Sequence, residues 1–494
     1  MIRTLAKQIK EFKLASILTP LCMIGEVIAE MIIPLLVASI VDNGVMAGDI
    51  RAVVNTGLEM VLISLIGLFF GCMGARFGAH AATGFARNLR GAMYRNIQSF
   101  SFSNIDKYST AGLVTRLTTD ITNVQMAYMM ILRMCFRAPV SLIVAMFMAV
   151  RISPKLSQIF CVALVFLTIV MALLISKTMG LFSRVFKKYD ALNASVQENV
   201  SAIRVVKAYV REKFENSRFR KASGDVYQLF VSAEKMMTIV MPVMQIAIYG
   251  CILALSWFGA HMIVGGSLTT GDLMSLFTYC MNILMSLMML SMVFVMITMS
   301  KASAERIAEV LNESSDLTNG ENPVKQIPDG SIVFENVSFA YPGSMRTTLK
   351  NIDLSIRSGE TIGVIGGTGS AKSSLVSLIP RLYDVTAGSV MVGGRDVREY
   401  DLEALRNAVA MVLQKNVLFS GTIYDNLRWG NPNATDEQCR EACRMACADD
   451  FIERMPDAYN SKIEQGTHEE LLRSNKIYQE VYYSQQKGEQ DNGE

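Results

Sequence analysis

"ETIGVIGGTGSAKSSLVSLI", from Glu360 to Ile379, decides the fold of the C-terminal part of the chain. Its first residues, Glu360–Ile365, are typical of a buried strand. A turn rich in Gly and Ser follows, and apolar residues then recur at helical spacing. The sequence therefore predicts a strand, a Gly-rich turn and a helix in direct succession.

The turn matches the phosphate-binding pattern G-x-x-x-x-G-K-[ST], except that Ala371 replaces the last Gly. Such a loop directs backbone N–H groups and a helix N-terminus at phosphates. Lys372 is expected to reach the β- and γ-phosphates, and Ser373 to ligate Mg²⁺. The residues expected to hold ATP in this loop are Gly366, Gly367, Thr368, Gly369, Ser370, Ala371, Lys372, Ser373 and Ser374.

The Cβ of Ala371 is expected to weaken nucleotide binding. If the position needs a positive φ, a Cβ costs about 1–2 kcal/mol. If the loop must approach phosphate closely, the methyl group intrudes. Either effect predicts ATP affinity about tenfold lower.

Hydrolysis needs an acidic residue at the end of a buried strand to hold Mg²⁺. After Lys372, no run of four apolar residues ends in Asp or Glu: "VAMVLQ" ends in Gln414, and "SVMVGG" ends in glycines. Upstream, "SIVFENVSFAY" (Ser331–Tyr341) alternates like a strand. The C-terminal part is thus predicted to be an α/β nucleotide-binding domain without a complete catalytic site.

Composition places the rest of the chain in a membrane. Of 494 residues, 51% are hydrophobic and 18% are charged, against about 25% charged in soluble proteins. Apolar runs long enough to span a bilayer, about 20 residues each, lie near 15–41, 56–81, 127–151, 157–179, 237–265 and 272–298. The net charge of +3 is too small to argue for a nucleic-acid partner.

Lys and Arg predict the orientation of these spans. They are dense before residue 14 and in 82–126 and 177–236, and nearly absent from the connections near 43–55 and 266–271. Arg151 and Lys155 are positive charges in the third connection, and they disagree mildly with the orientation that the other Lys and Arg residues predict. Both termini and both long loops are expected in the cytosol. The second loop keeps helical periodicity over Asn193–Phe219, so the helices should extend far beyond the membrane.

Two features within the spans are candidate substrate sites. Glu26 and Glu30 are one helical turn apart, and each costs about 3 kcal/mol at mid-bilayer. They are either a site for a cationic substrate or protons, or structural partners of a group such as Arg76. On the last span, Met281, Met285, Met288, Met292, Met296 and Met299 form one stripe. Flexible thioethers suit a surface that binds varied apolar ligands. The alternative interpretations of the stripe are ordinary helix packing and a copper(I) site.

Cysteine spacing raises one further alternative. Cys439, Cys443 and Cys447 recur every four residues on a predicted helix, which suggests either metal binding or small residues that face a core. No fourth ligand is nearby in the sequence, which favours the core.

Several sequence motifs together resemble those of an ABC exporter half-transporter of the multidrug and lipid-exporter type. The resemblance covers nearly the whole chain. "STAGLVTRLTTDI" (Ser109–Ile121) resembles the first intracellular loop, and "SAERIAEVL" (Ser303–Leu311) resembles the linker into the ATPase domain. The resemblance implies that Tyr341 stacks on adenine. It also implies that Gln414, in "MVLQKNVLFSGTIYDNL", senses Mg²⁺ and the attacking water.

The resemblance also reveals a junction near 466–467. "EQG" at Glu464–Gly466 and "GTHEELL" at Gly466–Leu472 are far apart in this family, yet here they share Gly466. The signature, the Walker B acid, the catalytic Glu and the switch His belong between them. His468 matches the later phrase and is not expected to be catalytic. The domain beyond about residue 400 is expected to fold poorly.

The implied architecture is an all-α six-helix transmembrane domain (1–312), a linker (313–330) and a truncated α/β P-loop domain (331–494). The implied function is ATP-dependent export of amphipathic or apolar small molecules, peptides or lipids across the plasma membrane. A second half-transporter is the expected partner, with lipid around both. ATP hydrolysis is expected to be impaired. The alternative is a non-catalytic partner or decayed copy that at most binds nucleotide.

Overall fold

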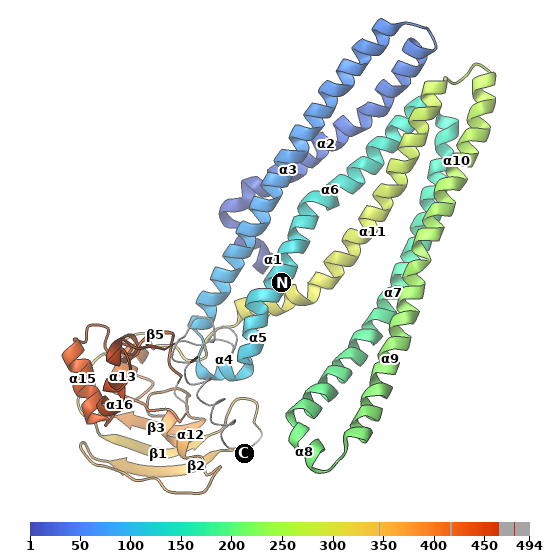
Figure 1. Ribbon diagram of the computed structural model, residues 1–494. Helices are drawn as coiled ribbons and strands as arrows, with labels where there is room; N and C mark the ends of the chain where they lie inside the picture. The colour runs from blue at the N-terminus through green and yellow to red at the C-terminus, as the bar shows by residue number, and fades with distance from the viewer. Residues whose placement is uncertain (345, 415–416, 464–478, 480–494) are drawn as a thin grey trace. The chain divides into compact units, whose positions relative to one another are not determined.

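The computed structural model describes residues 1–344, 346–414, 417–463 and 479 (Figure 1). The chain forms two compact units. The first contains Met1–Thr318 with Phe339–Thr348 and Leu382–Asp384, and the second contains the remaining segments.

Six helical stretches of the first unit are long and apolar enough to cross a membrane. In chain order they are α1 (Ile2–Ala6), η1 (Lys7–Phe12), α2 (Lys13–Ser39) and η2 (Ile40–Val45); α3 (Ile50–Gln98); α5 (Thr110–Thr115), η3 (Arg116–Asp120) and α6 (Ile121–Ile152); α7 (Pro154–Ser201); α9 (Glu212–Thr238) and α10 (Val240–Val264); and α11 (Thr270–Asn312). Each stretch contains one predicted span, except that the fifth ends one residue early, at Val264. The six-span prediction is confirmed.

The helices extend far beyond a bilayer, as predicted. With 48 residues at 1.5 Å per residue, α7 is about 70 Å long, whereas the hydrocarbon core is about 30 Å thick. The helical periodicity over Asn193–Phe219 does not correspond to one continuous helix. The short α8 (Ile203–Ala208) lies between α7 and α9, and Val210 adopts φ 53° at the turn into α9. Helical periodicity did not reveal this turn, because neither Gly nor Pro marks it.

The start of α11 packs closely against the end of α2 and against η2. The Gly271 N–H donates to Asp42 Oδ1 at 2.9 Å, which satisfies a donor of the first turn of α11. A Cβ at Gly271 would lie 2.5 Å from the Ala38 carbonyl oxygen, so only Gly permits this approach. Farther along, the Tyr279 hydroxyl donates to the Met31 carbonyl at 2.8 Å. Here α2, α6, α7, α10 and α11 share one apolar core.

A second core holds the opposite part of the first unit. It joins α3, α6 and α11 near the short helix α4 (Phe102–Lys107), and includes Leu89, Met93, Ile121 and Val310. Beside it, the Asp120 side chain is 1% exposed and accepts from Arg306 Nε at 2.7 Å. A buried carboxylate requires such a partner, so this pair fixes η3 against α11.

The second unit is built on a four-stranded sheet in the order β2-β1-β3-β4. The strands are β1 (Ile332–Phe339), β2 (Leu349–Ile356), β3 (Ala387–Val392) and β4 (Arg395–Asp396). β1 and β3 are antiparallel, with Phe334 opposite Val390, and both of these side chains are buried. The predicted strand over Ser331–Tyr341 is confirmed as β1.

The strand predicted at Glu360–Ile365 is not formed. These residues belong to no strand, and the Ile365 side chain is 98% exposed. "VAMVLQ" is likewise irregular, and Val412 is 88% exposed. A parallel strand is stable only between neighbours that complete its ladder and cover both faces. Among residues 346–414 and 417–463, no strand pairs with Glu360–Ile365. The helix that follows, α12 (Lys372–Ser377), has six residues.

The segment 421–463 is more ordered than expected. It contains β5 (Gly421–Thr422), β6 (Lys462–Ile463), α14 (Ile423–Leu427), α15 (Asp436–Met445), α16 (Asp449–Glu453) and η4 (Ala458–Asn460), and α13 (Leu402–Ala408) precedes it. Tyr424, Ile452 and Tyr459 form a buried cluster with Cys439 and Cys443, as the core interpretation of these cysteines predicted. Cys447 lies beyond α15 and is exposed. Poor folding beyond residue 400 is therefore wrong for this segment. The junction at 466–467 and His468 lie outside the described residues.

Candidate nucleotide and substrate sites

The lysine of the Gly-rich loop, Lys372, hydrogen-bonds to other residues of the same loop. Lys372 Nζ donates to the carbonyl oxygens of Gly366 at 2.7 Å and Gly367 at 2.9 Å, and to Ser370 Oγ at 3.2 Å. A Cβ on Gly366 would lie 2.6 Å from Ser370 Oγ. The loop is thus a tight cradle that admits only backbone at this point, and its residues fit a phosphate group held by N–H donors and an ammonium.

Ala371 lies in the left-handed region, with φ 63° and ψ 23°, at the N-cap of α12. Gly369 also has a positive φ, of 86°. The first of the two explanations for the Gly normally found at position 371 therefore applies: the backbone needs a positive φ. An alanine there carries about 1–2 kcal/mol of strain that a glycine would avoid.

The remaining nucleotide-site candidates lie in less regular surroundings. Ser373 is exposed at the start of α12, and Ser374 is buried within it. Gln414 is exposed in an irregular segment, and within residues 346–414 and 417–463 no hydrogen bond joins it to the loop. Tyr341 follows β1 and lies edge-on to the rings of Phe339 and Tyr383, with centroids 4.9 and 5.2 Å away.

One strand of the described residues does end in an acid. β4 ends at Asp396, but its carboxylate accepts from Arg398 Nη2 at 2.6 Å and from Arg398 Nε at 2.9 Å. An Asp held bidentately by Arg is already neutralised. Asp396 is therefore a poor candidate for the acid that holds Mg²⁺ in a P-loop ATPase.

Within the membrane-spanning helices, Arg137 joins the two predicted glutamates. Arg137 Nη1 lies 2.6 Å from Glu26 Oε1, and Nη2 lies 2.8 Å from Glu30 Oε2. Arg76, which the sequence suggested as a partner, is exposed. The sequence did not identify Arg137, because Arg76, Arg133 and Arg137 all lie within predicted spans and only the packing of α6 against α2 selects one of them.

These three charged residues line a cavity of about 520 Å³ between α2, α3 and α6. Small residues of α3 form its opposite wall, and a Cβ on Gly71 would lie 3.3 Å from the Glu26 carboxyl carbon. Two carboxylates and one guanidinium leave one negative charge in the cavity. This charge would favour a cationic group over an anionic one.

The methionine stripe lies on the more open face of α11. Met285 and Met292 are more than half exposed, Met296 is half-buried, and Met288 packs against the core. None of these methionines lines the cavity at Glu26 and Glu30. The structure therefore does not bring the two predicted substrate features into one cavity.

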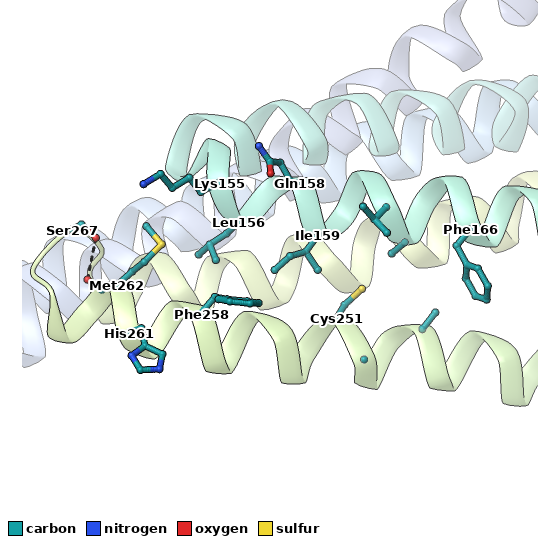
Figure 2. Close-up of a pocket in the computed structure, with 14 residues that line it drawn as sticks. Lys155, Leu156, Gln158, Ile159, Phe166, Cys251, Phe258, His261, Met262 and Ser267 are labelled. Atoms are coloured by element: carbon teal, nitrogen blue, oxygen red, sulfur yellow. Dashed lines mark hydrogen bonds between the residues drawn. The ribbon is translucent and has the colours of Figure 1, made fainter.

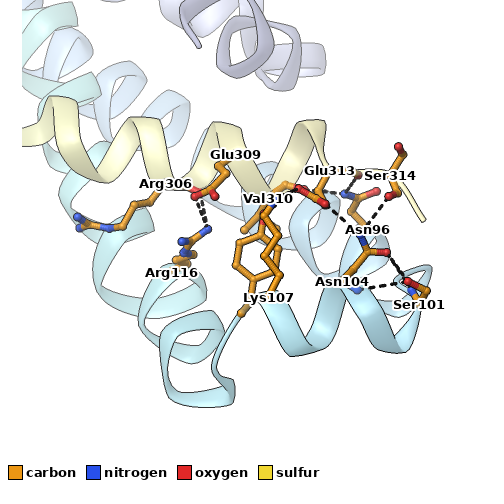
Figure 3. Close-up of polar contacts among 11 residues, drawn as sticks. Asn96, Ser101, Asn104, Lys107, Arg116, Arg306, Glu309, Val310, Glu313 and Ser314 are labelled. Atoms are coloured by element: carbon orange, nitrogen blue, oxygen red, sulfur yellow. Dashed lines mark hydrogen bonds and ion pairs between the residues drawn. The ribbon is translucent and has the colours of Figure 1, made fainter. Parts of the chain in front are cut away.

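A polar junction forms where α11 ends, close to α3 and α4 (Figure 3). The Glu313 carboxylate accepts from Lys107 Nζ at 2.7 Å and from Asn104 Nδ2 at 2.9 Å. Asn96 Nδ2 donates to the Val310 carbonyl oxygen at 2.7 Å. The hydrogen bond from Lys107 holds the pKa of Glu313 below its usual value. Sequence spacing gave no signal for these contacts, because their partners are about two hundred residues apart.

Two protein-family models match this chain. The model of the ABC transporter transmembrane region matches residues 16–288, and the ABC transporter model matches residues 349–472. The chain belongs to the ABC transporter family. It is a multi-pass membrane protein in which an exporter-type membrane domain is fused to an ATP-binding domain.

Relatives of this ABC transporter include both uncharacterised and named proteins. An uncharacterised ABC transporter ATP-binding protein of Bacillus subtilis is 33% identical over 92% of this chain and 80% of its own length. An ATP-dependent lipid A-core flippase of Syntrophus aciditrophicus is 29% identical over 76% of this chain and 62% of its own length. A multidrug efflux ATP-binding/permease protein of Mycobacterium tuberculosis is 30% identical over 89% of this chain and 36% of its own length.

Proposed function

We propose that this chain is one half of a dimeric exporter for amphipathic or apolar molecules, with impaired ATP hydrolysis. Its partner would be a second half-transporter, identical or different, in the plasma membrane with both termini in the cytosol. The membrane domain would comprise residues 1–312, the linker 313–330 and the ATPase domain 331–494. Lipid surrounds the helices, and no nucleic acid takes part.

The cavity at Glu26, Glu30 and Arg137 supports the substrate class. Its single net negative charge lies among apolar helices, which suits an amphipathic compound with a cationic group. The exposed methionines of α11 offer a flexible apolar surface. The names of the flippase and multidrug relatives agree with substrates of this general kind.

The conformation of Ala371 carries the proposal of weak nucleotide binding and impaired turnover. The residue before Lys372 is strained by a Cβ at φ 63°. The segment that should hold the loop in a sheet, Glu360–Ile365, has no strand partner among the residues that the structure describes. The junction that the sequence suggests at 466–467 would remove the neighbouring strands, the Walker B acid and the signature together. A partner chain would be able to supply a signature to Lys372, but the Walker B acid acts within its own domain.

The alternative is a non-catalytic partner that at most binds nucleotide. It is favoured by the three hydrogen bonds that Lys372 makes within its own loop, which ATP must break before the ammonium reaches phosphate. This alternative and an impaired exporter differ in turnover, not in architecture.

Photolabelling with 8-azido-ATP tests the nucleotide site of the full chain in lipid. We expect labelling that excess ATP prevents and that Lys372→Ala abolishes, while Lys350→Ala, an exposed lysine on β2, leaves it unchanged. The partner is tested by co-purification of two differently tagged copies. Labelling that survives Lys372→Ala would contradict the assignment of the loop.

A further inference from the structure

A second cavity, of about 820 Å³, runs between α7 and α10 (Figure 2). Leu156 and Cys251 form a buried floor, with 2% and 5% of their surfaces exposed. Phe166 and Phe258 also line it and are more than half exposed. The cavity is therefore an open groove with apolar walls, and it is separate from the cavity at Glu26 and Glu30.

The polar residues of the groove gather at one end. Lys155, Gln158, His261 and Ser267 lie there, and Phe166 lies toward the other end (Figure 2). This polar end is where α7 begins, at Pro154, and where α10 ends, at Val264. The groove thus passes from the edge of the membrane-spanning segments toward their middle.

The dimensions and the charge fit a single lipid. From Leu156 to Phe166, ten residues of helix cover about 15 Å, which is half of a hydrocarbon core of about 30 Å. The side chains that line the groove include Lys155 and His261 but no carboxylate. A ligand with a negative head and an apolar tail complements this arrangement.

We propose that the groove binds an anionic phospholipid, with its phosphate at Lys155 and His261 and one acyl chain along Ile159, Phe258 and Phe166. A zwitterionic lipid would bring its own cation beside Lys155, so the anionic lipid is preferred. The Lys155 ammonium attracts an anionic head group by Coulomb's law, and the attraction is stronger where the membrane lowers the dielectric constant. The lipid here is a bound component of the membrane domain, distinct from the exported substrate.

Trp257 provides a local reporter. Its ring is 5.2 Å from the His261 ring, centroid to centroid, and the chain has only two tryptophans. In a Trp429→Phe background, the fluorescence of the full-length protein reports Trp257 alone. The protein is placed in phosphatidylcholine vesicles that contain either brominated phosphatidylglycerol or brominated phosphatidylcholine at equal mole fraction, without ATP.

We expect brominated phosphatidylglycerol to associate near Trp257 about fivefold more strongly than brominated phosphatidylcholine, since one Lys near a membrane surface contributes about that factor. Lys155→Gln should reduce this preference to near one. Lys177→Gln, an exposed lysine of the same helix outside the groove, should keep it. Persistent quenching by brominated phosphatidylcholine shows that the variants are folded and embedded.

Two results would overturn the proposal. Equal quenching by both lipids would mean ordinary contact with bulk lipid. No quenching by either lipid would mean that a second copy of the chain, or another protein segment, covers the groove. Because the measurement needs no ATP, neither result depends on the state of the nucleotide site.

Discussion

The Lys372 ammonium donates a hydrogen bond to the Gly366 carbonyl oxygen at 2.7 Å and so spans the whole phosphate-binding loop. A phosphate would have to displace the ammonium from this acceptor. The loop between these residues contains Ala371 at a positive φ. Nucleotide binding therefore competes with an internal hydrogen bond and with backbone strain.

Ala371→Gly should strengthen ATP binding by up to about tenfold, because it removes about 1–2 kcal/mol of strain from the loop conformation. The measurement is the Kd for a fluorescent ATP analogue on the full-length protein in lipid. Ala371→Ser keeps a Cβ and serves as the control, with an expected affinity near that of the unmodified chain. An unchanged Kd for Ala371→Gly would show that strain at this position does not limit binding.

Arg137→Met should lower the free energy of unfolding by about 3 kcal/mol, because it leaves the Glu26 and Glu30 carboxylates without their cation inside the membrane-spanning helices. Thermal or denaturant unfolding in detergent measures the loss. Arg76→Met removes an exposed arginine and should change stability little. Adding Glu26→Gln and Glu30→Gln to Arg137→Met should restore most of the stability. If the triple variant is no more stable than Arg137→Met alone, the loss does not come from unpaired carboxylates.

Acid should weaken the polar junction at the end of α11. The hydrogen bond from Lys107 lowers the pKa of Glu313 from its usual 4.5. The stabilisation is present above the unfolded-state value and is lost as the pH falls through the lowered folded-state value. Melting temperatures of the unmodified protein should therefore fall below about pH 4.5 more steeply than those of Glu313→Gln. Glu321→Gln, at an exposed position beyond the end of α11, should behave like the unmodified protein. Equal slopes for Glu313→Gln and the unmodified protein would contradict this role of Glu313.

Backbone amides of Glu360–Gly366 should exchange hydrogen far faster than those of β1 and β3. The first segment belongs to no strand, whereas Phe334 and Val390 lie opposite each other in a paired ladder. Hydrogen-exchange mass spectrometry of the full chain compares the two regions directly. Protection of Glu360–Gly366 equal to that of β1 would mean that this segment has a strand partner after all.

Local apolar patterns carried most of the correct structural predictions. The six spans were predictable because runs of about 20 apolar residues have few alternatives to a membrane helix. β1 was predictable because Ser331–Tyr341 alternates with period two. Both signals are local, so they did not depend on the rest of the fold.

Predictions that depended on distant partners were less successful. The apolar character of Glu360–Ile365 suits a strand, yet a strand also needs neighbours that no described residue supplies. The cation for Glu26 and Glu30 depended on which face of α6 packs against α2, and this selected Arg137 over Arg76. At Ala371 the sequence identified the position and its two possible costs, and the backbone angle distinguished between them.

ATP hydrolysis by the purified chain in lipid, compared with Lys372→Ala, tests the central claim most directly. We expect the chain to hydrolyse ATP barely faster than Lys372→Ala, because no described residue supplies an acid that could hold Mg²⁺ at the loop and no described strand pairs with Glu360–Ile365. Turnover clearly above that of Lys372→Ala would contradict the account, since it would require a catalytic acid and a signature supplied from elsewhere.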